Sequence, residues 1–430
     1  MLRAAWQANN PGMRRMEAKV APFGVSRRDA LARLAAGCAA LSLGASHAWA
    51  AAPRPAAGAC RVDPWPLWDV FKTQFLQPDG RVVDASSSQM HSSSEGQSYC
   101  MFFALVANDQ HAFEAMWRWS VNNLLGGDVA HNLPAWHWGL AEDGTWRVLD
   151  KNSASDADLW FVYALLEAGR AWGRADYTAD GRTLLANIEL RETAVLPGLG
   201  KMLLPGEYSF AQANALWRLN PSYMPIPLLR RLAAASPAGG WNEVATNTIK
   251  MIQATAPKGF SPDWLAYQGA GASAGHFIVD PLKGDLGSYD AIRVYLWAGM
   301  TPVDEPLAAS LMRAVSGLAK ATNGAAPPPE KVVTTTGETS GSGPFGFSAA
   351  LLPYLKVTNQ TKLLDLQRQR VETLQKLTLL PEILQSRRPP YYDYVLTLFS
   401  LGWIERRYHF QRNGTLHLLW EETCPHVATR

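Results

Sequence analysis

Three separate stretches of the sequence place carboxyl groups beside serine and aromatic residues, at points where helices are expected to begin. They contain Glu95, the pair Asp156 and Asp158, and Asp290. Two carboxyl groups that flank a substrate can hydrolyse a glycosidic bond, one as general acid and the other as general base or nucleophile. Each acid also has a simpler interpretation as a helix cap, and Ser92-x-x-Glu95 reads as a capping box. Spacing alone therefore permits a shared catalytic site without requiring one.

Other common catalytic arrangements are missing from the sequence. It has no Gly-x-Ser-x-Gly elbow, no His-Glu-x-x-His, no phosphate-binding loop and no Gly-x-Gly-x-x-Gly after a strand. The nine histidines are scattered singly, so we predict no metal site and no cofactor. With 40 basic and 37 acidic residues, no strong field exists to bind nucleic acid or an anionic membrane. Seventeen Trp, 13 Tyr and 14 Phe favour a carbohydrate partner, because flat apolar rings match the faces of sugars.

Helices dominate the expected secondary structure. Apolar residues recur at three- and four-residue spacing in many segments, and more weakly over 221–235. The clear segments are 65–75, 97–107, 112–124, 156–172, 182–196, 242–254, 290–298, 306–322, 347–357, 361–377 and 392–406. Strands and helices do not alternate and no fixed repeat occurs, which excludes a Rossmann or TIM plan. The pattern predicts a single all-α domain and leaves a toroid or a bundle open.

Short strands are expected between the helices. They are predicted over 146–149 and 331–336, and in a hairpin around Asn413-Gly414 with flanks at 409–411 and 415–419. Residues 325–343, rich in Pro, Thr, Gly and Ser, predict a long loop. A domain boundary there is the alternative. We interpret the loop as an insertion, because the helices after it are needed to complete an even set of pairs.

The first 50 residues have the pattern of an export signal. The twin-arginine sequence Ser26-Arg27-Arg28 precedes an apolar run over 31–43 and the small-x-small sequence Ala48-Trp49-Ala50. We predict cleavage after residue 50, a single catalytic domain over 51–430, and a periplasmic or secreted location. The apolar run is too short for a membrane span, so no stable membrane insertion is expected. An N-terminal core helix is the alternative.

The cysteines agree with an oxidising compartment. Cys38 lies in the predicted signal, where a cut before it would instead make a lipoprotein. Removing the signal leaves Cys60, Cys100 and Cys424. Because chain termini often lie close together, we predict a disulfide between Cys60 and Cys424. Cys100 lies on an apolar helix face and is expected to be a small buried thiol.

The acidic segments resemble the motifs of glycoside hydrolase family 8, close to the branch encoded in bacterial cellulose-synthase operons. The acids stand in Ser94-Glu95-Gly96-Gln97-Ser98-Tyr99, Asn152-Ser153-Ala154-Ser155-Asp156-Ala157-Asp158 and Ser288-Tyr289-Asp290-Ala291. Further matching segments are 102–109, 133–136, 256–264, 288–297 and 394–399, so the resemblance covers essentially the whole mature chain. It implies an (α/α)6 barrel with short β-hairpin excursions and a long cleft where the acids gather. It also implies an endo-β-1,4-glucanase that cuts cellulose with inversion of configuration.

The same resemblance implies roles for the acids. Glu95 is the expected general acid, Asp290 the general base, and Asp156 a carboxylate that holds the sugar and helps to position water. An acid in a poorly solvated site can hold its proton near neutral pH, which suits the apolar and aromatic neighbours of Glu95. Arg293, one helical turn after Asp290, is expected as its charge partner. Asp263 in Ser-Pro-Asp-Trp is the alternative base.

Five aromatic residues are candidates for stacking on sugar rings or contacting sugar hydroxyls. They are Tyr99, Trp136, Trp138, Tyr223 and Tyr289. Trp138, Tyr223 and Tyr289 are equally well explained as core residues.

Two other functions stay open. A family relative could act on lichenan, xylan or chitosan, and a non-catalytic glucan-binding component of an exopolysaccharide export system would also keep the aromatic residues. The three acids favour the enzyme. The expected partners are β-1,4-glucan chains and the cellulose synthase export machinery.

Overall fold

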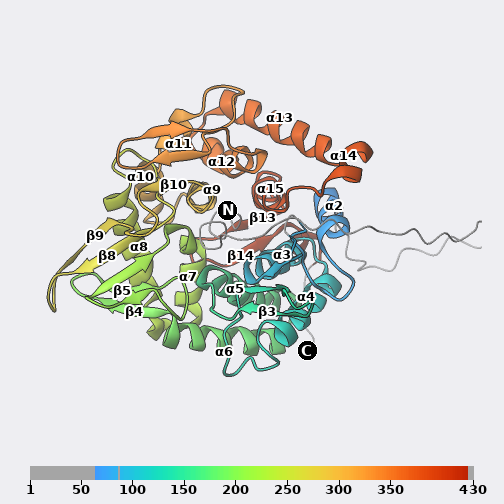
Figure 1. Cartoon of the computed structure of the whole chain (residues 1–430). Helices are drawn as coiled ribbons and strands as arrows, with labels where there is room; N and C mark the ends of the chain where they lie inside the picture. The colour runs from blue at the N-terminus through green and yellow to red at the C-terminus, as the bar shows by residue number, and fades with distance from the viewer. Residues whose placement is uncertain (1–62, 86–87, 425–430) are drawn as a thin grey trace, which may run out of the picture. The chain divides into compact units, whose positions relative to one another are not determined.

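The computed structural model describes residues 63–85 and 88–424, and the predicted signal peptide lies outside these residues (Figure 1). The α-helices are α2 (Pro66–Phe75), α3 (Ser94–Val106), α4 (Gln110–Asn123), α5 (Ser155–Trp172), α6 (Ala175–Arg191), α7 (Ile226–Ala235), α8 (Trp241–Thr255), α9 (Ile292–Met300), α10 (Ala308–Ala314), α11 (Gly317–Ala321), α12 (Phe345–Val357), α13 (Thr361–Thr378), α14 (Pro381–Ser386), α15 (Tyr391–Ile404) and α16 (Leu419–Thr423). Two 3₁₀ helices, η1 (Pro221–Tyr223) and η2 (Pro237–Gly239), flank α7.

Six inner helices form a ring, and each is packed against an outer helix. The inner helices follow one another around the ring in the order α3, α5, α7, α9, α12 and α15. Between α7 and α9 the ring is closed by η1, which precedes α7 in the chain and contacts α5 and α9, and α15 contacts α3. The outer partners are α4, α6, α8, α10, α13 and α2 in the same order. The difference between the layers is visible in burial, because α12 is buried along almost its whole length whereas α13 buries only Gln367 and Val371. This is the (α/α)6 barrel that the sequence resemblance implied.

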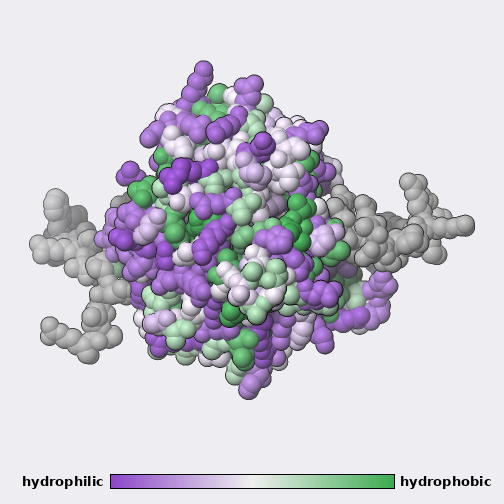
Figure 2. Space-filling model, turned by 90° about the vertical axis from the view of Figure 1, so that its left-hand side faces the viewer, coloured by the Kyte–Doolittle hydropathy of each residue, from purple (hydrophilic) through white to green (hydrophobic). Residues whose placement is uncertain are grey.

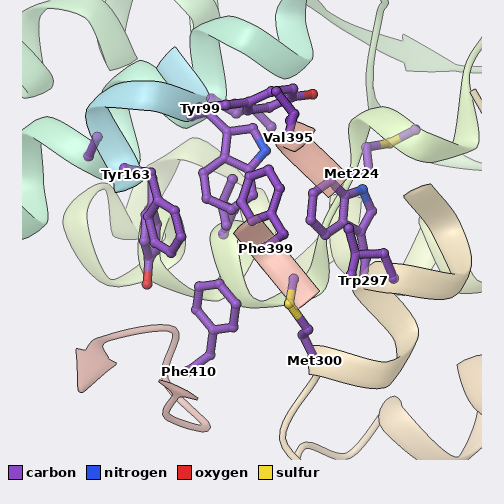
Figure 3. Close-up of a cluster of buried hydrophobic side chains, with 14 of the residues drawn as sticks. Tyr99, Tyr163, Met224, Trp297, Met300, Val395, Phe399 and Phe410 are labelled. Carbon is purple, nitrogen blue, oxygen red and sulfur yellow. The ribbon is translucent and has the colours of Figure 1, made fainter. Parts of the chain in front are cut away.

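Aromatic side chains fill the centre of the ring. Figure 3 shows Tyr99, Tyr163, Trp297 and Phe399 gathered there from different inner helices. The rings of Trp297 and Phe399 lie 5.2 Å apart, and those of Tyr163 and Phe410 lie 5.8 Å apart. Edge-to-face and tilted contacts of this kind add to the stabilisation from burial. The core holds the inner helices at fixed positions, so side chains at their ends are held as well.

Short strands lie in the connections between the helices. They are β1 (Ser92–Ser93), β2 (His137–Leu140), β3 (Trp146–Asp150), β4 (Thr193–Leu196), β5 (Gly200–Leu203), β6 (Ala211–Gln212), β7 (Leu216–Leu219), β8 (Leu265–Gly269), β9 (Gly275–Val279), β10 (Leu286–Gly287), β11 (Lys331–Val333), β12 (Glu338–Ser340), β13 (Tyr408–Phe410) and β14 (Leu416–Leu418). They pair antiparallel as β1-β2-β3, β10-β11-β12, β6-β7-β8-β9 and the hairpins β4-β5 and β13-β14. The four-stranded sheet joins segments far apart in the chain.

Most predicted elements agree with the structure, and three differ. The helix expected over 182–196 begins at Ala175 and ends at Arg191, because residues 193–196 pair with β5 as strand β4. The helix expected over 306–322 is two short helices, α10 and α11. The loop expected over 325–343 contains β11 and β12, and the helices on both of its sides belong to one compact unit.

Figure 2 shows the face that carries the strand extensions at the left of Figure 1. Hydrophilic and hydrophobic side chains are mixed there in small patches. Within the described residues, no helix combines the length and apolar character needed to cross a membrane.

Cys100 is buried and free, as predicted, and Cys424 is disulfide-bonded. Cys60 lies outside the described residues, so its pairing with Cys424 stays a prediction.

Mass spectrometry of the unreduced mature protein should find a peptide that contains both Cys60 and Cys424. Because a disulfide that closes a long loop stabilises by about 2–5 kcal/mol, reduction should lower the melting temperature and leave activity at room temperature. Free thiols at both positions in exported protein would contradict the pairing.

Candidate active site

The candidate acids meet because the helices that carry them start at the same end of the ring. Glu95 lies in the first turn of α3, Asp156 in the first turn of α5, and Asp290 just before α9. Hydrogen bonds link the starts of α3, α5 and α9 directly, through Tyr99, Asp156 and Arg293. Helix N-termini carry partial positive charge, which favours carboxylates at this end.

None of the three acids is primarily a side-chain cap. Ser93, not Ser92, caps α3, since its Oγ accepts a hydrogen bond from the N–H of Gly96 at 3.1 Å. The capping-box interpretation of Glu95 is therefore wrong. Asp156 Oδ1 accepts from the N–H of the adjacent Ala157 at 2.8 Å, which leaves Oδ2 to other partners.

Arg293 connects two of the acids. Its Nη2 lies 3.4 Å from Oδ2 of Asp156 and 3.3 Å from Oδ1 of Asp290, and it donates to Oγ of Ser222 at 2.8 Å. Tyr99 donates its hydroxyl to Oδ2 of Asp156 at 3.2 Å. The expected charge partner of Asp290 is thus shared with Asp156, and the guanidinium holds the two carboxylates at one place.

Glu95 lies in a site that favours its protonated form. Removal from water and, next, the nearby negative charge of Asp156 together raise the pKa of Glu95 to about 8. The pKa of Asp156 is raised to about 6, mainly by burial, while the charge of Arg293 opposes the rise. Near neutral pH, Glu95 therefore carries a proton while Asp156 is largely ionised.

Asp290 and Asp263 differ in exposure and in hydrogen bonding. Asp263 is 3% exposed, and its Oδ1 accepts backbone hydrogen bonds from Ser288, Asp290 and Ala291 at 2.7, 3.1 and 2.7 Å. It anchors the chain at the start of α9. Asp290 keeps 24% of its side chain exposed and accepts from Nε1 of Trp264 at 3.1 Å. Asp290 is therefore the carboxylate that water and a substrate can reach.

Trp136 and Tyr223 are partly exposed beside the acids. The carbonyl of Trp136 accepts from the N–H of Ser94 at 3.1 Å, which ties it to the residue before Glu95, and its ring is stacked on His137 with 4.6 Å between centroids. The guanidinium of Arg293 lies 5.8 Å from the ring centroid of Tyr223. Tyr99, by contrast, is buried and acts through its hydroxyl.

The structure gives Trp138 and Tyr289 other partners. Trp138 is stacked on Trp146 at 5.3 Å, with the guanidinium of Arg81 4.4 Å from its ring centroid. Tyr289 donates its hydroxyl to Oε1 of Glu330 at 3.0 Å, although its backbone carbonyl accepts from Tyr392. The side chains of both residues therefore make their described contacts outside the group of acids.

The sequence did not single out three residues that contact the group. They are Trp264, Ser222 and Tyr392, which bond Asp290 or Arg293. Trp264 directly follows the motif residue Asp263 and could have been found there. Ser222 and Tyr392 carry no local signal, because their role depends on the helix packing.

No group of three His, Cys, Asp or Glu side chains suited to a metal ion occurs among residues 63–85 and 88–424.

The raised pKa of Glu95 predicts a pH-dependent stability. An unfolded chain releases this proton near the ordinary value of 4.5, whereas the fold keeps it until about pH 8. The contribution of Glu95 is therefore fully present below pH 4.5 and is lost as the pH rises through about 8. In urea unfolding, the free energy of unfolding of Glu95→Gln should match that of the wild type at pH 4 and exceed it by roughly 4 kcal/mol at pH 8. A difference that does not change with pH would contradict the raised pKa of Glu95.

Comparisons with known proteins agree with this arrangement. The sequence profile described as glycosyl hydrolases family 8 matches residues 45–406. The chain is 47% identical to an endoglucanase of Pseudomonas fluorescens over 84% of its length and 92% of that protein, and 42% identical to one of Escherichia coli K12 over the same shares. The crystal structure of an endo-1,4-D-glucanase from Vibrio fischeri, 38% identical, has a TM-score of 0.75 and covers 83% of this chain and 99% of its own. Together with the (α/α)6 fold, these matches show that the chain belongs to glycosyl hydrolase family 8 and is a glycoside hydrolase.

Proposed function

We propose that the protein is a secreted endo-β-1,4-glucanase that hydrolyses cellulose with inversion of configuration. The observation that carries the proposal is the presence of two partly exposed acids beside the guanidinium of Arg293, a proton-holding Glu95 and the carboxylate of Asp290. The endoglucanases that this chain resembles support the choice of a β-1,4-glucan.

The general acid in this proposal is Glu95. Its raised pKa lets it hold a proton at neutral pH and donate it to the glycosidic oxygen as the bond to the anomeric carbon breaks. The leaving chain then departs as a neutral alcohol. The charge of Asp156, which helps to keep the proton on Glu95 in the free enzyme, also stabilises positive charge that develops on the sugar ring.

The general base in this proposal is Asp290. Its two oxygens accept hydrogen bonds from Trp264 and Arg293, and the exposed part of the side chain can meet a water molecule. Asp290 takes a proton from that water as the water oxygen attacks the anomeric carbon from the face opposite the leaving group. A direct attack of this kind inverts the configuration.

Tyr99, Asp156 and Arg293 are proposed to position the sugar and the attacking water between the acid and the base. Trp136 and Tyr223, partly exposed at the same place, are proposed to contact sugar faces. Trp138 and Tyr289 are retained as weaker candidates, because their described contacts are made elsewhere.

Export is proposed from the N-terminal pattern, and the disulfide at Cys424 fits an oxidising compartment. A periplasmic or secreted glucanase would meet cellulose chains as they leave the cell. On that ground we also propose an association with cellulose biosynthesis and with the cellulose synthase export machinery.

The roles of the acids predict distinct effects of three amide substitutions. Glu95→Gln and Asp290→Asn should each lower kcat on cellulose oligomers by roughly 10²–10⁴-fold, because each removes one proton-transfer step. Asp263→Asn should lower kcat by less than about tenfold, since the new amide oxygen can still accept the three backbone hydrogen bonds. Glu338→Gln, on the exposed strand β12, is the surface control. If Asp263→Asn is inactive while Asp290→Asn keeps its hydrolytic activity, the general base is Asp263.

The stereochemistry predicts the first product. NMR of cellulose-oligomer hydrolysis should show the α-anomer at the new reducing end before mutarotation. The same assay on mixed-linkage glucan, xylan and chitosan should give slower turnover. An initial β-anomer would show retention, and faster cleavage of another polymer would change the proposed substrate.

A further inference from the structure

Two carboxyl groups that the proposed mechanism does not use are buried beside Asp156. Asp158 lies in the first turn of α5, and Glu192 directly follows α6. Neither side chain is exposed, and the two carboxyls are placed so that one can hydrogen-bond the other once a proton is present between them. No N–H or hydroxyl group of a described residue bonds either oxygen of Asp158. A carboxyl–carboxyl hydrogen bond requires a proton, so this contact holds at least one.

The surrounding hydrogen bonds favour Asp158 as the carboxyl that carries that proton. The backbone N–H of Glu207 donates to Oγ of Ser153 at 2.9 Å, and the Ser153 hydroxyl donates its only proton to Oε1 of Glu192 at 2.6 Å. Glu192 therefore accepts a hydrogen bond at Oε1, which supports its charged form, and only its Oε2 lacks a donor. Asp158 has no donor at either oxygen, so its charged form is the less stabilised of the two.

The charges around the pair disfavour a second negative charge there. Asp156 and Glu95 act on Asp158, and Asp156 and Glu207 act on Glu192. Two guanidinium groups of this region pair with other carboxyls, since Arg293 binds Asp156 and Arg191 lies 4.0 Å from Glu207. A second negative charge at this place would be buried without a cation. Burial raises the pKa of both carboxyls, that of Glu192 to about 8 and that of Asp158 well above its ordinary range.

We propose that Asp158 stays protonated in the working enzyme, donates its proton to Glu192, and is a positioning residue that holds Asp156 toward Arg293. The bond ties the first turn of α5 to the end of α6, and Asp156 lies in that turn. A neutral Asp158 also keeps a further negative charge away from Glu95. The effect on turnover rests on the proposed function, whereas the site of the proton does not.

Infrared spectroscopy tests the proton without any substrate. In protein labelled with ¹³C-aspartate, Asp158→Asn should remove a protonated-carboxyl band at pH 7. Asp128→Asn is the matched control, because Asp128 is half-exposed beside His131 and should lose an ionised-carboxylate band. Loss of an ionised-carboxylate band from Asp158→Asn would overturn the proposal, even if the protein proved to have another activity.

Kinetics separates positioning from simple structural support. Asp158→Asn keeps a neutral donor to Glu192, so kcat should stay within about threefold and both limbs of the pH profile should be unchanged. Asp158→Leu, of similar size, removes the donor, and kcat should fall by roughly 10²-fold with a smaller change in KM. If Asp158→Leu does not fold, the pH profile of Asp158→Asn still tests whether Asp158 is protonated. A shift of its basic limb to lower pH would show that Asp158 is normally charged and would overturn the proposal.

Discussion

Arg293 is the positive charge around which the acids of the site are arranged. In the described part of the chain it is the only cation that forms an ion pair with Asp156 or Asp290. One guanidinium cannot balance every nearby carboxyl, because each buried negative charge needs its own compensation. A carboxyl left without a cation in this region, such as Glu95, therefore favours its protonated form. Glu95 keeps its proton because it is poorly solvated and has no cation of its own to balance a negative charge.

The fold makes this arrangement possible. The ring of inner helices brings the starts of α3, α5 and α9 together, and the aromatic core of Figure 3 keeps them in place. Asp263 adds a local constraint, because its carboxylate fixes the backbone at Ser288, Asp290 and Ala291. Asp290 is thus held by the backbone on one side and by Trp264 and Arg293 on the other. A base held in this way needs little reorganisation before it accepts a proton.

The sequence predicted the helices well because their apolar periodicity is strong, and it singled out the candidate acids because they stand in specific motifs. It placed the end of α6 wrongly, since residues 193–196 leave the helix to pair with β5, a partner that periodicity does not report. The four-stranded sheet was missed for the same reason, because its strands are short and β7 and β8 lie far apart in sequence. Ser222 and Tyr392 could not be found from local patterns, since only the closed ring brings them to Arg293. Trp138 was a candidate for a sugar contact from its residue type, and in the structure its ring is stacked on Trp146.

The most direct test of this account is the pKa of Glu95 in the free enzyme. It can be followed by NMR of protein labelled with ¹³C at the glutamate carboxyl, with Glu95→Gln used to assign the resonance. The account predicts a titration near pH 8, as expected for a carboxyl that burial and the charge of Asp156 keep protonated. A titration near the ordinary value of 4.5 would show that Glu95 is ionised at neutral pH and would contradict its role as the general acid.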